Sequence, residues 1–353
     1  MTLHIFNPEH DLALAADMPT FTPPHAARQL RHDLGFIPAL WASDGDVVLV
    51  DNKGWAEKEL PKVKAMLRRI GVDITNNVSF IEESEIHNLN IDDIRPWGWD
   101  TAIATRLIKN GIDCHLIPSA EQLSDIRWHS HRLTATKLLP QLLNIPNTIG
   151  QSFLCQSLSE IEEHLVKFDN IVIKAPWSSS GRGLRFGIGS LTEHQCGWIK
   201  NMISKQGALI VEPYYNKVRD IGMEFIRNND GSLSYLGLSL FTTHNGAYTG
   251  NLIATENAKM DIIERHTDRD TIYQLRDAIC QFLPNLIPSY YGPIGIDMMQ
   301  LYDGTIHPCV EINLRRTMGH VALNISPLQP DDLIKSMRIE QINSNYKLKI
   351  RQV

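Results

Sequence analysis

The sequence is poor in cysteine, and the few cysteines it has are scattered. Five of the 353 residues are cysteines, and none forms a CxxC pair. This spacing predicts neither a disulfide framework nor a cysteine-based zinc site. We expect free thiols in a reducing compartment. The five are Cys114, Cys155, Cys196, Cys280 and Cys309.

Long apolar segments are also missing. The N-terminus, MTLHIFNPEH, has no basic stretch followed by a long apolar run, so it does not read as a signal peptide. Apolar runs such as Val47–Val50 have the length of a strand and are far too short to cross a membrane. These features predict a cytoplasmic protein with no membrane partner.

The chain carries no excess of positive charge. Its net charge is −6 and its pI is near 6.2, which argues against nucleic acid as a partner because such binding needs a basic field. A composition of 43% hydrophobic and 21% charged residues is that of an ordinary globular protein. A chain of 353 residues is too long for one compact core, so we expect two or three domains.

Strands and helices alternate in the first third of the chain. Short apolar runs bounded by turn residues predict strands, and longer amphipathic segments that end at glycine predict helices. Such alternation indicates a parallel α/β domain. The predicted strands are Leu3–Phe6, Val47–Val50 and Cys114–Ile117, and the predicted helices are His25–Leu34, Trp55–Ile70 and Thr101–Asn110.

Beyond about residue 125, strands become more frequent and the pattern changes to α+β. A long helix is predicted over Ile263–Leu283, followed by a β-hairpin around Tyr302-Asp303-Gly304. The predicted strands are Ile171–Lys174, Ala208–Glu212, Ile221–Ile226, Ser234–Phe241, Ile294–Leu301 and Ile306–Ile312.

The segment VIKAPWSSSGRGLRF combines a strand-terminal lysine with a loop of small residues. Lys174 ends the strand, and the loop that follows runs from Ser178 to Gly183. Small side chains let backbone N–H groups approach phosphate oxygens, and the lysine supplies a point charge. The order of a P-loop is absent. A plain surface turn is the alternative for this segment taken alone.

The late hairpin, GPIGIDMMQLYDGTIHPCVEINLRR, places oxygen-bearing side chains on neighbouring strands. Glu311 and Asn313 are two residues apart, so they project from the same face of their strand. Asp297 on the other strand can share that face. Hard oxygen ligands that converge in this way are typical of a Mg²⁺ site. Arg315 and Arg316 follow directly and suit an anionic group. A polar, solvent-facing hairpin edge is the alternative.

A weaker motif is LIVEPYYNKVRDIGMEF, in which an apolar strand delivers Glu212 just before Pro213 and Tyr214. A strand that passes into a loop exposes backbone groups that can bind the edge of an adenine. A structural Glu-Pro turn is the alternative when the motif stands alone.

Taken in order, these motifs resemble the ATP-grasp superfamily, although no particular member of it. The resemblance covers roughly residues 125–330, and VEINLRRTMGH is its most specific part. It implies a pre-ATP-grasp-like α/β domain over 1–125 and an ATP-grasp domain over 126–330. The lid would span about 126–208, the core about 209–330, and 331–353 would form a C-terminal tail with no assigned role.

The resemblance also implies a role for each motif. Lys174 would hold the α- and β-phosphates of ATP, and the small-residue loop would close over the triphosphate. Two Mg²⁺ ions, or Mn²⁺ in their place, would bind the oxygen ligands of the late hairpin. The residues so implied are Ser179, Ser180, Gly181 and Gly183 in the loop; Glu212, Pro213 and Tyr214 at the adenine; Glu224 (or Asp220) at the ribose or substrate; Asp297, Glu311 and Asn313 at the metal; and Arg315 or Arg316, with Lys174, in catalysis.

The chain departs from the family at the start of this region, where a lysine that contacts ATP is usual. The matching stretch here is SHRLTATKLL, and Arg132 is the best-aligned basic residue. Lys137 lies five positions further on. We expect Arg132 to bind ATP, and a helix-surface cation without a role is the alternative.

Near the N-terminus, NPEHDLALA follows the first strand at the place where open α/β sheets bind ligands. Glu9, His10 and Asp11 could contact substrate there, and helix capping by Asp11 is an equal alternative. Trp97 and Trp99 could line a pocket, although packing is the expected role.

The function that the resemblance implies is an ADP-forming ligase. MgATP would activate a small-molecule carboxylate as an acylphosphate, which an amine then attacks. A kinase on the same scaffold and a nucleotide-binding module without turnover are the alternatives. The sequence names neither substrate. The oligomeric state also stays open, a homodimer being the commonest arrangement among homo-oligomers.

Overall fold

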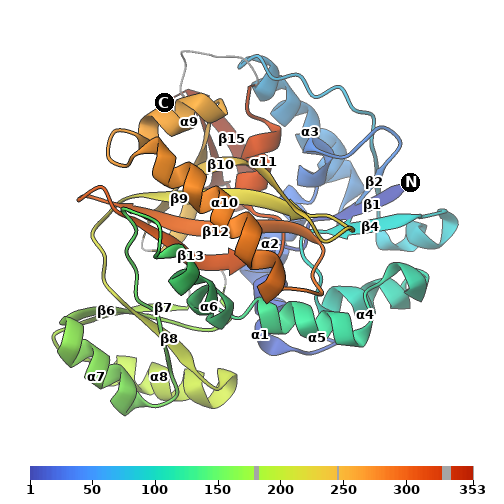
Figure 1. Cartoon of the computed structure of the whole chain (residues 1–353). Coiled ribbons are helices and arrows are strands. Elements are labelled where there is room, and N and C mark those ends of the chain that lie inside the picture. The colour runs from blue at the N-terminus through green and yellow to red at the C-terminus, as the bar shows by residue number, and fades with distance from the viewer. Residues whose placement is uncertain (179–182, 245, 328–334, 353) are drawn as a thin grey trace. The chain divides into compact units, whose positions relative to one another are not determined.

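The computed structural model describes residues 1–178, 183–244, 246–327 and 335–352 (Figure 1). By packing, the chain divides into two units. The first comprises Met1–Arg127, Thr249–Lys259 and Arg315–Val353, and the second Trp128–Tyr248 and Met260–Leu314. The sequence-based division differs in three respects, the first being that it assigned Thr249–Lys259 to the ATP-grasp domain. It also assigned residues 315–330 to the ATP-grasp domain, and it left 331–353 as a separate tail.

The first unit contains a parallel four-stranded sheet in the order β3-β2-β1-β4. The strands are β1 (Thr2–Ile5), β2 (Val47–Leu49), β3 (Ser79–Ile81) and β4 (Asp93–Pro96). The helices are α1 (His10–Ala16), α2 (His25–Leu34), η1 (Ile37–Leu40), α3 (Lys53–Arg68), η2 (Glu83–Asn88), α4 (Thr101–Lys109), η3 (Cys114–Leu116), α5 (Ala120–His129) and α11 (Met318–Asn324).

Both faces of this sheet are buried, as in other parallel sheets. Leu3 and Ile5 of β1 pack on one side with Leu107 of α4. On the other side, Val48 of β2 packs with Leu67 of α3. Successive side chains of a strand point to opposite faces, so the short apolar runs supply both cores. The predicted α/β character of this region is therefore confirmed.

The C-terminal segment is a folded part of the first unit. Strand β14 (Lys335–Ile342) pairs antiparallel with β15 (Asn345–Gln352), and β11 (Ala247–Ile253) pairs with β14 from Gly250 to Ile253. Asn343 and Ser344 join β14 to β15 with φ angles of 48° and 67°, as a two-residue hairpin turn requires. Met337 and Leu348 are buried in the same core as Val48, which fixes the hairpin there.

The second unit contains a small antiparallel sheet in the order β5-β8-β6-β7, covered on one face by two helices (Figure 1). Apolar side chains of β6 and β8 alternate toward those helices, which gives the sheet one buried face. The elements are β5 (Phe153–Cys155), α7 (Leu158–Phe168), β6 (Asn170–Lys174), β7 (Leu184–Ile188), α8 (Glu193–Gln206) and β8 (Leu209–Pro213).

A second antiparallel group of strands completes this unit, in the order β13-β12-β9-β10. Helix α6 packs against β13, and α10 packs against α6. The strands are β9 (Lys217–Arg227), β10 (Leu233–His244), β12 (Gly292–Leu301) and β13 (Ile306–Asn313), and the helices are α6 (Leu133–Leu142), α10 (Arg269–Leu286) and the second half of α9 (Glu256–Ile263). The predicted late hairpin is present as β12 and β13.

One predicted element was wrong, and another begins later than predicted. Cys114–Ile117 was expected to be a strand, but Cys114–Leu116 is a 3₁₀ helix whose N-cap, Asp113, accepts a hydrogen bond from the His115 backbone. The helix expected over Ile263–Leu283 is present as α10, but it begins six residues later, at Arg269, because residues 264–268 connect it to α9.

All five cysteines are free thiols. In the part of the chain that the structure describes, no helix is both long and apolar enough to span a bilayer.

Candidate active site

Lys174 and Glu212 form a buried ion pair in the second unit. Lys174 ends β6, and Glu212 lies in β8 opposite Val172, so the two side chains are diagonal neighbours on one face of the sheet. The Lys174 Nζ lies 2.5 Å from Glu212 Oε2, and the side chains are only 6% and 4% exposed. Burial lowers the pKa of Lys174, and the facing carboxylate of Glu212 opposes that shift.

The position of this pair follows from the alternation of the strands. Ile171 and Ile173 of β6 point to the opposite face, where they join Leu209 and Val211 of β8 in the core beneath α7 and α8. Lys174 therefore turns away from that core. The apolar residues on one face fix which way the charged residues on the other face point.

The loop after β6 is closed at its base. The backbone N–H of Ala175 donates to the carbonyl of Gly183 at 2.8 Å. A Cβ on Gly183 would lie 2.3 Å from the Cβ of Ser178, so a side chain does not fit there. Close backbone packing thus explains one glycine of the predicted loop. The predicted loop residues Ser179, Ser180 and Gly181 lie outside the described residues.

Arg132 joins that loop to the late hairpin. It is buried just before α6, and its Nε donates to the Ala175 carbonyl at 3.0 Å. Its Nη2 contacts Ser178 Oγ at 3.4 Å and Glu311 Oε1 at 2.9 Å. Lys137, the other basic residue of this stretch, is exposed. Of the two, Arg132 is the one that lies among the predicted site residues.

The three predicted metal ligands share one face of the hairpin. Asp297 pairs with Glu311 across β12 and β13, and Gly295 pairs with Asn313, so all three side chains project from the same side. Asn313 Nδ2 lies 3.4 Å from Asp297 Oδ2. Ile296 and Ile312 pair on the opposite, buried face, as the alternation predicted.

These ligands are two carboxylates and one amide, and their oxygen atoms are of the kind that Mg²⁺ prefers. The donor set therefore fits a hard divalent cation. Elsewhere in the described residues, a trio of potential ligands lies within 4.8 Å of one another at Asp113, Cys114 and His115, all of them exposed.

Glu224 extends the acidic face onto β9. It pairs with Gly295, and Gly222 pairs with Asp297, so β9 adds a carboxylate next to the predicted metal ligands. Glu224 is 2% exposed. A Cβ on Gly222 would lie 3.0 Å from Glu224 Oε1. The glycine thus leaves room beside this carboxylate.

In the segment predicted to bind adenine, one backbone N–H is already used within the protein. The backbone N–H of Tyr214 donates to the Asn170 carbonyl at 2.9 Å, and Pro213 has no N–H. The Tyr214 side chain is exposed and contacts the ring of Phe186. The Tyr214 N–H is therefore already used by the sheet and is not available to a base.

Two residues near the ion pair were missed at the level of sequence. His307 is fully buried, its Nε2 lies 3.9 Å from Glu212 Oε2, and burial lowers its pKa to about 4. Neither of its ring nitrogens has a hydrogen-bond partner among the described residues. Burial also raises the pKa of the Cys309 thiol, and Glu212 and Asp297 add to that shift. Their only sequence signal is that they share a strand with Glu311.

The two predicted arginines belong to the first unit. Arg315 donates from Nε and Nη2 to the two carboxylate oxygens of Asp11, each at 2.9 Å. The guanidinium of Arg316 lies 4.6 Å from the centre of the Trp41 ring, and its backbone N–H donates to the Trp97 carbonyl. Both side chains therefore have partners within this unit, and a catalytic role for them stays a prediction.

The three polar residues of the N-terminal motif that were expected to contact substrate each bind a different side chain. Glu9 forms an ion pair with Arg31, His10 lies 3.1 Å from Asp100, and Asp11 binds Arg315. Glu9 occupies the N-cap position of α1, so the alternative of capping by Asp11 was wrong.

Trp97 and Trp99 both pack within the first unit, as expected. Trp97 is buried against Phe6, with their ring centres 5.0 Å apart, and Trp99 packs beside the other core.

Comparison with known proteins gives no match to a family model and none to a curated sequence. The likeness is to solved structures. The N5-carboxyaminoimidazole synthetase of Staphylococcus aureus, complexed with ADP, superposes with a TM-score of 0.51 at 13% identity, over 96% of this chain and 82% of that chain.

Two biotin carboxylase structures are similarly related. That of Campylobacter jejuni has a TM-score of 0.53 at 14% identity, over 96% of this chain and 75% of that chain. The biotin carboxylase domain of Hydrogenobacter thermophilus 2-oxoglutarate carboxylase, in complex with MgADP, has a TM-score of 0.53 at 12% identity, over 88% and 72%. At this identity the likeness shows the fold alone.

Proposed function

Starting from the ATP-grasp fold of this chain, we propose that it is an MgATP-dependent, ADP-forming ligase. It would activate a small-molecule carboxylate as an acylphosphate and join it to an amine. The contacts around Arg132 are the observation that carries the proposal. This one guanidinium contacts both the loop after Lys174 and the acidic hairpin at Glu311. The predicted phosphate and metal residues are thereby neighbours in one unit.

In the proposed nucleotide site, Lys174 and Arg132 hold the phosphates. The loop from Ser178 to Gly183 closes over them and excludes water, which would hydrolyse an acylphosphate. Glu212 and the carbonyl groups that follow it receive the base, and Glu224 contacts the ribose or the substrate.

Asp297, Glu311 and Asn313 would hold Mg²⁺, which neutralises charge on the transferring phosphoryl group when it is bound. The Glu311 carboxylate is already held by Arg132, so its orientation is set by the protein. Arg315 or Arg316 would stabilise the phosphoryl group or orient the carboxylate.

The proposed reaction needs no protein nucleophile. A substrate carboxylate oxygen attacks the γ-phosphorus of ATP, and the bond to the β-phosphate oxygen breaks, which gives an acylphosphate and ADP. The amine then attacks the acyl carbon and expels inorganic phosphate, with loss of a proton. Catalysis consists of positioning and of neutralising charge, as is general for phosphoryl transfer. A soluble homodimer acting on small molecules is the proposed working form.

An ADP-release screen tests this function. The purified chain is incubated with MgATP and pooled carboxylates and amines, and ADP is measured. We expect ADP formation that depends on both pools. ADP formation with a stable phosphorylated product and no need for an amine would indicate a kinase instead. ATP binding without ADP release in every pool would indicate a module without turnover.

Two isosteric variants test the metal assignment. Glu311→Gln and Asp297→Asn keep the side-chain shape but remove a charge, so we expect ADP formation to fall about 10³-fold. Asp303→Asn is the matched control, because Asp303 lies in the turn of the same hairpin, where its carboxylate accepts hydrogen bonds from Thr305. Undiminished ADP formation by the first two variants would refute the assignment.

A further inference from the structure

The four parallel strands of the first unit each place a polar group at the same edge of their sheet. The second residue after each strand is Asn7 for β1, Asp51 for β2, Glu83 for β3 and Gly98 for β4, the last through its carbonyl. The sheet order β3-β2-β1-β4 reverses between β1 and β4. In open parallel sheets, ligands bind outside the carboxyl ends of the strands at such a reversal.

A pocket of about 360 Å³ lies at this edge, within the range of roughly 300–1,000 Å³ that is typical of small-molecule sites. Phe21, Pro23 and Ile103 give it apolar surface. The charged side chains that line it are three cations and three carboxylates. They are Arg31, Arg106 and Lys109, and Glu9, Glu83 and Asp100.

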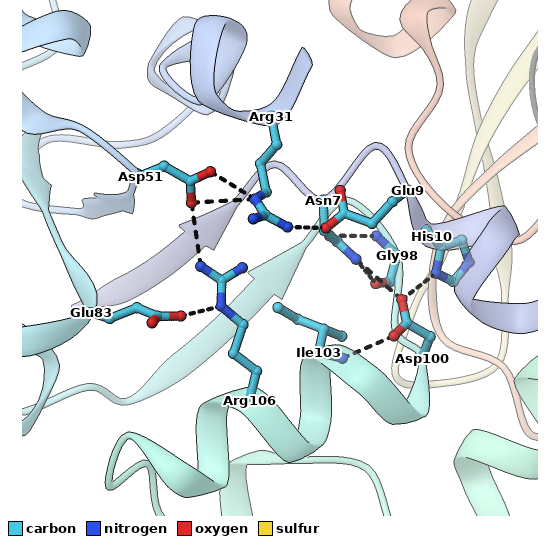
Figure 2. A network of polar contacts seen from close by, with 10 residues as sticks. All are labelled: Asn7, Glu9, His10, Arg31, Asp51, Glu83, Gly98, Asp100, Ile103 and Arg106. Carbon is cyan, nitrogen blue, oxygen red and sulfur yellow. Dashed lines mark hydrogen bonds and ion pairs between the residues drawn. The ribbon is translucent and has the colours of Figure 1, made fainter. Parts of the chain in front are cut away.

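One wall of the pocket is held by a buried hydrogen-bond network (Figure 2). Asp100 accepts from the Ile103 backbone at 2.9 Å, which caps α4, and also lies 3.1 Å from His10 Nδ1. Asn7 Nδ2 donates to the Gly98 carbonyl at 2.8 Å. A Cβ on Gly98 would lie 2.7 Å from the His10 ring, so the absent side chain makes room for this arrangement. The wall is therefore fixed before any ligand arrives.

The opposite part of the pocket is a chain of ion pairs (Figure 2). Arg31 lies between Glu9 and Asp51, with its Nε 3.0 Å from Asp51 Oδ2 and its Nη1 donating to Glu9 Oε1. Arg106 lies between Asp51 and Glu83, with its Nη2 3.4 Å from Asp51 Oδ1 and its Nε donating to Glu83. Asp51 thus accepts hydrogen bonds from both guanidinium groups and fixes their orientation.

Glu9, Arg31 and Arg106 each have one side-chain atom with no hydrogen-bond partner among the described residues. Within the described ranges, neither Nη2 of Arg31 nor Nη1 of Arg106 has a partner. The third is Oε2 of Glu9, a buried oxygen that accepts no hydrogen bond from the described residues. Glu9 is 7% exposed, and burial raises its pKa. A buried carboxylate oxygen without a donor is costly.

The unused groups have complementary chemistry. The free guanidinium N–H groups can donate to a carboxylate, and Glu9 can accept from an ammonium group. A purely anionic ligand would meet Glu9 and Glu83, and a purely cationic ligand would meet the arginines. A ligand with one charge of each sign satisfies both.

We propose that this pocket binds a small zwitterion of the amino-acid type, with its ammonium group at Glu9 and its carboxylate at Arg31 and Arg106. All of these residues belong to the first unit. The inference therefore goes beyond the proposed ligase reaction and does not depend on it.

Calorimetric titration of the full chain tests the proposal, in the absence of ATP and of divalent cations. The probes are glycine and the nineteen other standard amino acids in their L forms. For the strongest binder, its decarboxylated amine and its deaminated acid are titrated as well. We expect at least one amino acid to bind with a Kd of about 1 mM or below, and the two truncated probes to bind at least about tenfold more weakly. Binding of none of the twenty, or equal binding of a truncated probe, would overturn it.

Variants assign the binding to this pocket. Glu9→Gln should weaken the amino acid about tenfold or more, and Arg106→Lys, at a more exposed position, should weaken it severalfold. Asp73→Asn is the control, because Asp73 forms an exposed ion pair with Arg68 in the same unit. Circular dichroism confirms that each variant is folded. Unchanged affinity in both pocket variants would contradict the assignment.

The two proposals fail in different ways. A chain that binds an amino acid but never forms ADP refutes the ligase and leaves this site in place. A chain that forms ADP but binds no amino acid without nucleotide refutes this site alone.

Discussion

The two units hold their charged side chains in different ways. In the second unit, Lys174 and Glu212 are a single pair, 6% and 4% exposed, on neighbouring strands. In the first unit, five charged side chains share contacts at the ends of strands and on helices, and their exposed fractions range from 8% to 39%. They are Glu9, Arg31, Asp51, Glu83 and Arg106.

The degree of burial determines how much each arrangement contributes to the free energy of unfolding. A charge in a water-free interior depends on its partner, because no solvent can replace that partner. A half-exposed pair is screened, and its loss is partly compensated by water. The buried pair is therefore expected to be rigid and costly to break. The pairs that Arg106 forms with Asp51 and Glu83 are the more exposed part of the first unit's network, so they can exchange partners with a ligand at lower cost.

The largest expected effect comes from breaking the buried pair on one side. Lys174→Met leaves the Glu212 carboxylate buried without its cation, so we expect the free energy of unfolding to fall by about 3–5 kcal/mol. Urea denaturation without nucleotide measures it. Nucleotide binding should be lost in the same variant.

A second substitution separates the charge from the packing. In Lys174→Met with Glu212→Leu, no charge is left unpaired, so most of the lost stability should return. Lys200→Met, at an exposed position of α8, is the control and should change stability by less than about 0.5 kcal/mol. If the double variant is no more stable than the single one, the ion pair is not the cause.

Acid should weaken the second unit through His307. Burial lowers its pKa from 6.5 to about 4, so the native state stays neutral while the unfolded state takes up a proton. The stability that depends on neutral His307 is fully present above pH 6.5 and is lost as the pH falls through 4. The complete loss lowers the free energy of unfolding by an amount on the order of 3 kcal/mol. Glu212 opposes this shift, and Lys174 adds to it.

The variant His307→Leu cannot take up that proton. Urea midpoints of wild type and variant, compared from pH 7.5 to 4.5, should diverge as the pH falls, with the variant becoming relatively more stable. Parallel curves over that range would show that His307 does not titrate on unfolding.

The shared face of the three oxygen-bearing residues in the late hairpin could be predicted from the sequence because its geometry is local. A period of two puts Glu311 and Asn313 on one face, and a single hairpin brings Asp297 alongside. The Tyr214 N–H could not be predicted as occupied, because its acceptor, Asn170, belongs to another strand.

The first unit was harder to predict because its site depends on sheet order. Asp51 and Glu83 meet Arg106 only when β2, β1 and β3 take their places, and none of these residues forms a recognisable motif. Two strands, β3 and β4, were missed because neither is a continuous apolar run like β2: β3 begins with Ser79, and β4 contains Asp93 and Arg95.

Boundaries set by tertiary contacts also escaped prediction. The break between α9 and α10 is held by Gln300, whose Nε2 donates to the Ile263 carbonyl at 2.7 Å and to Thr267 at 3.0 Å. The predicted start at Ile263 was six residues too early, because periodicity alone does not reveal this contact.

The smallest expected effect tests the shared network of the first unit. Arg106→Met removes one guanidinium, but Asp51 keeps Arg31 as a partner, and Glu83, at 39% exposure, keeps access to water. We expect the free energy of unfolding to fall by no more than about 1 kcal/mol, by urea denaturation at low salt. Added salt should reduce the difference further, because exposed pairs are screened. A loss as large as that of Lys174→Met would contradict the contrast between the two units, since it would mean that the half-exposed network behaves as a buried one.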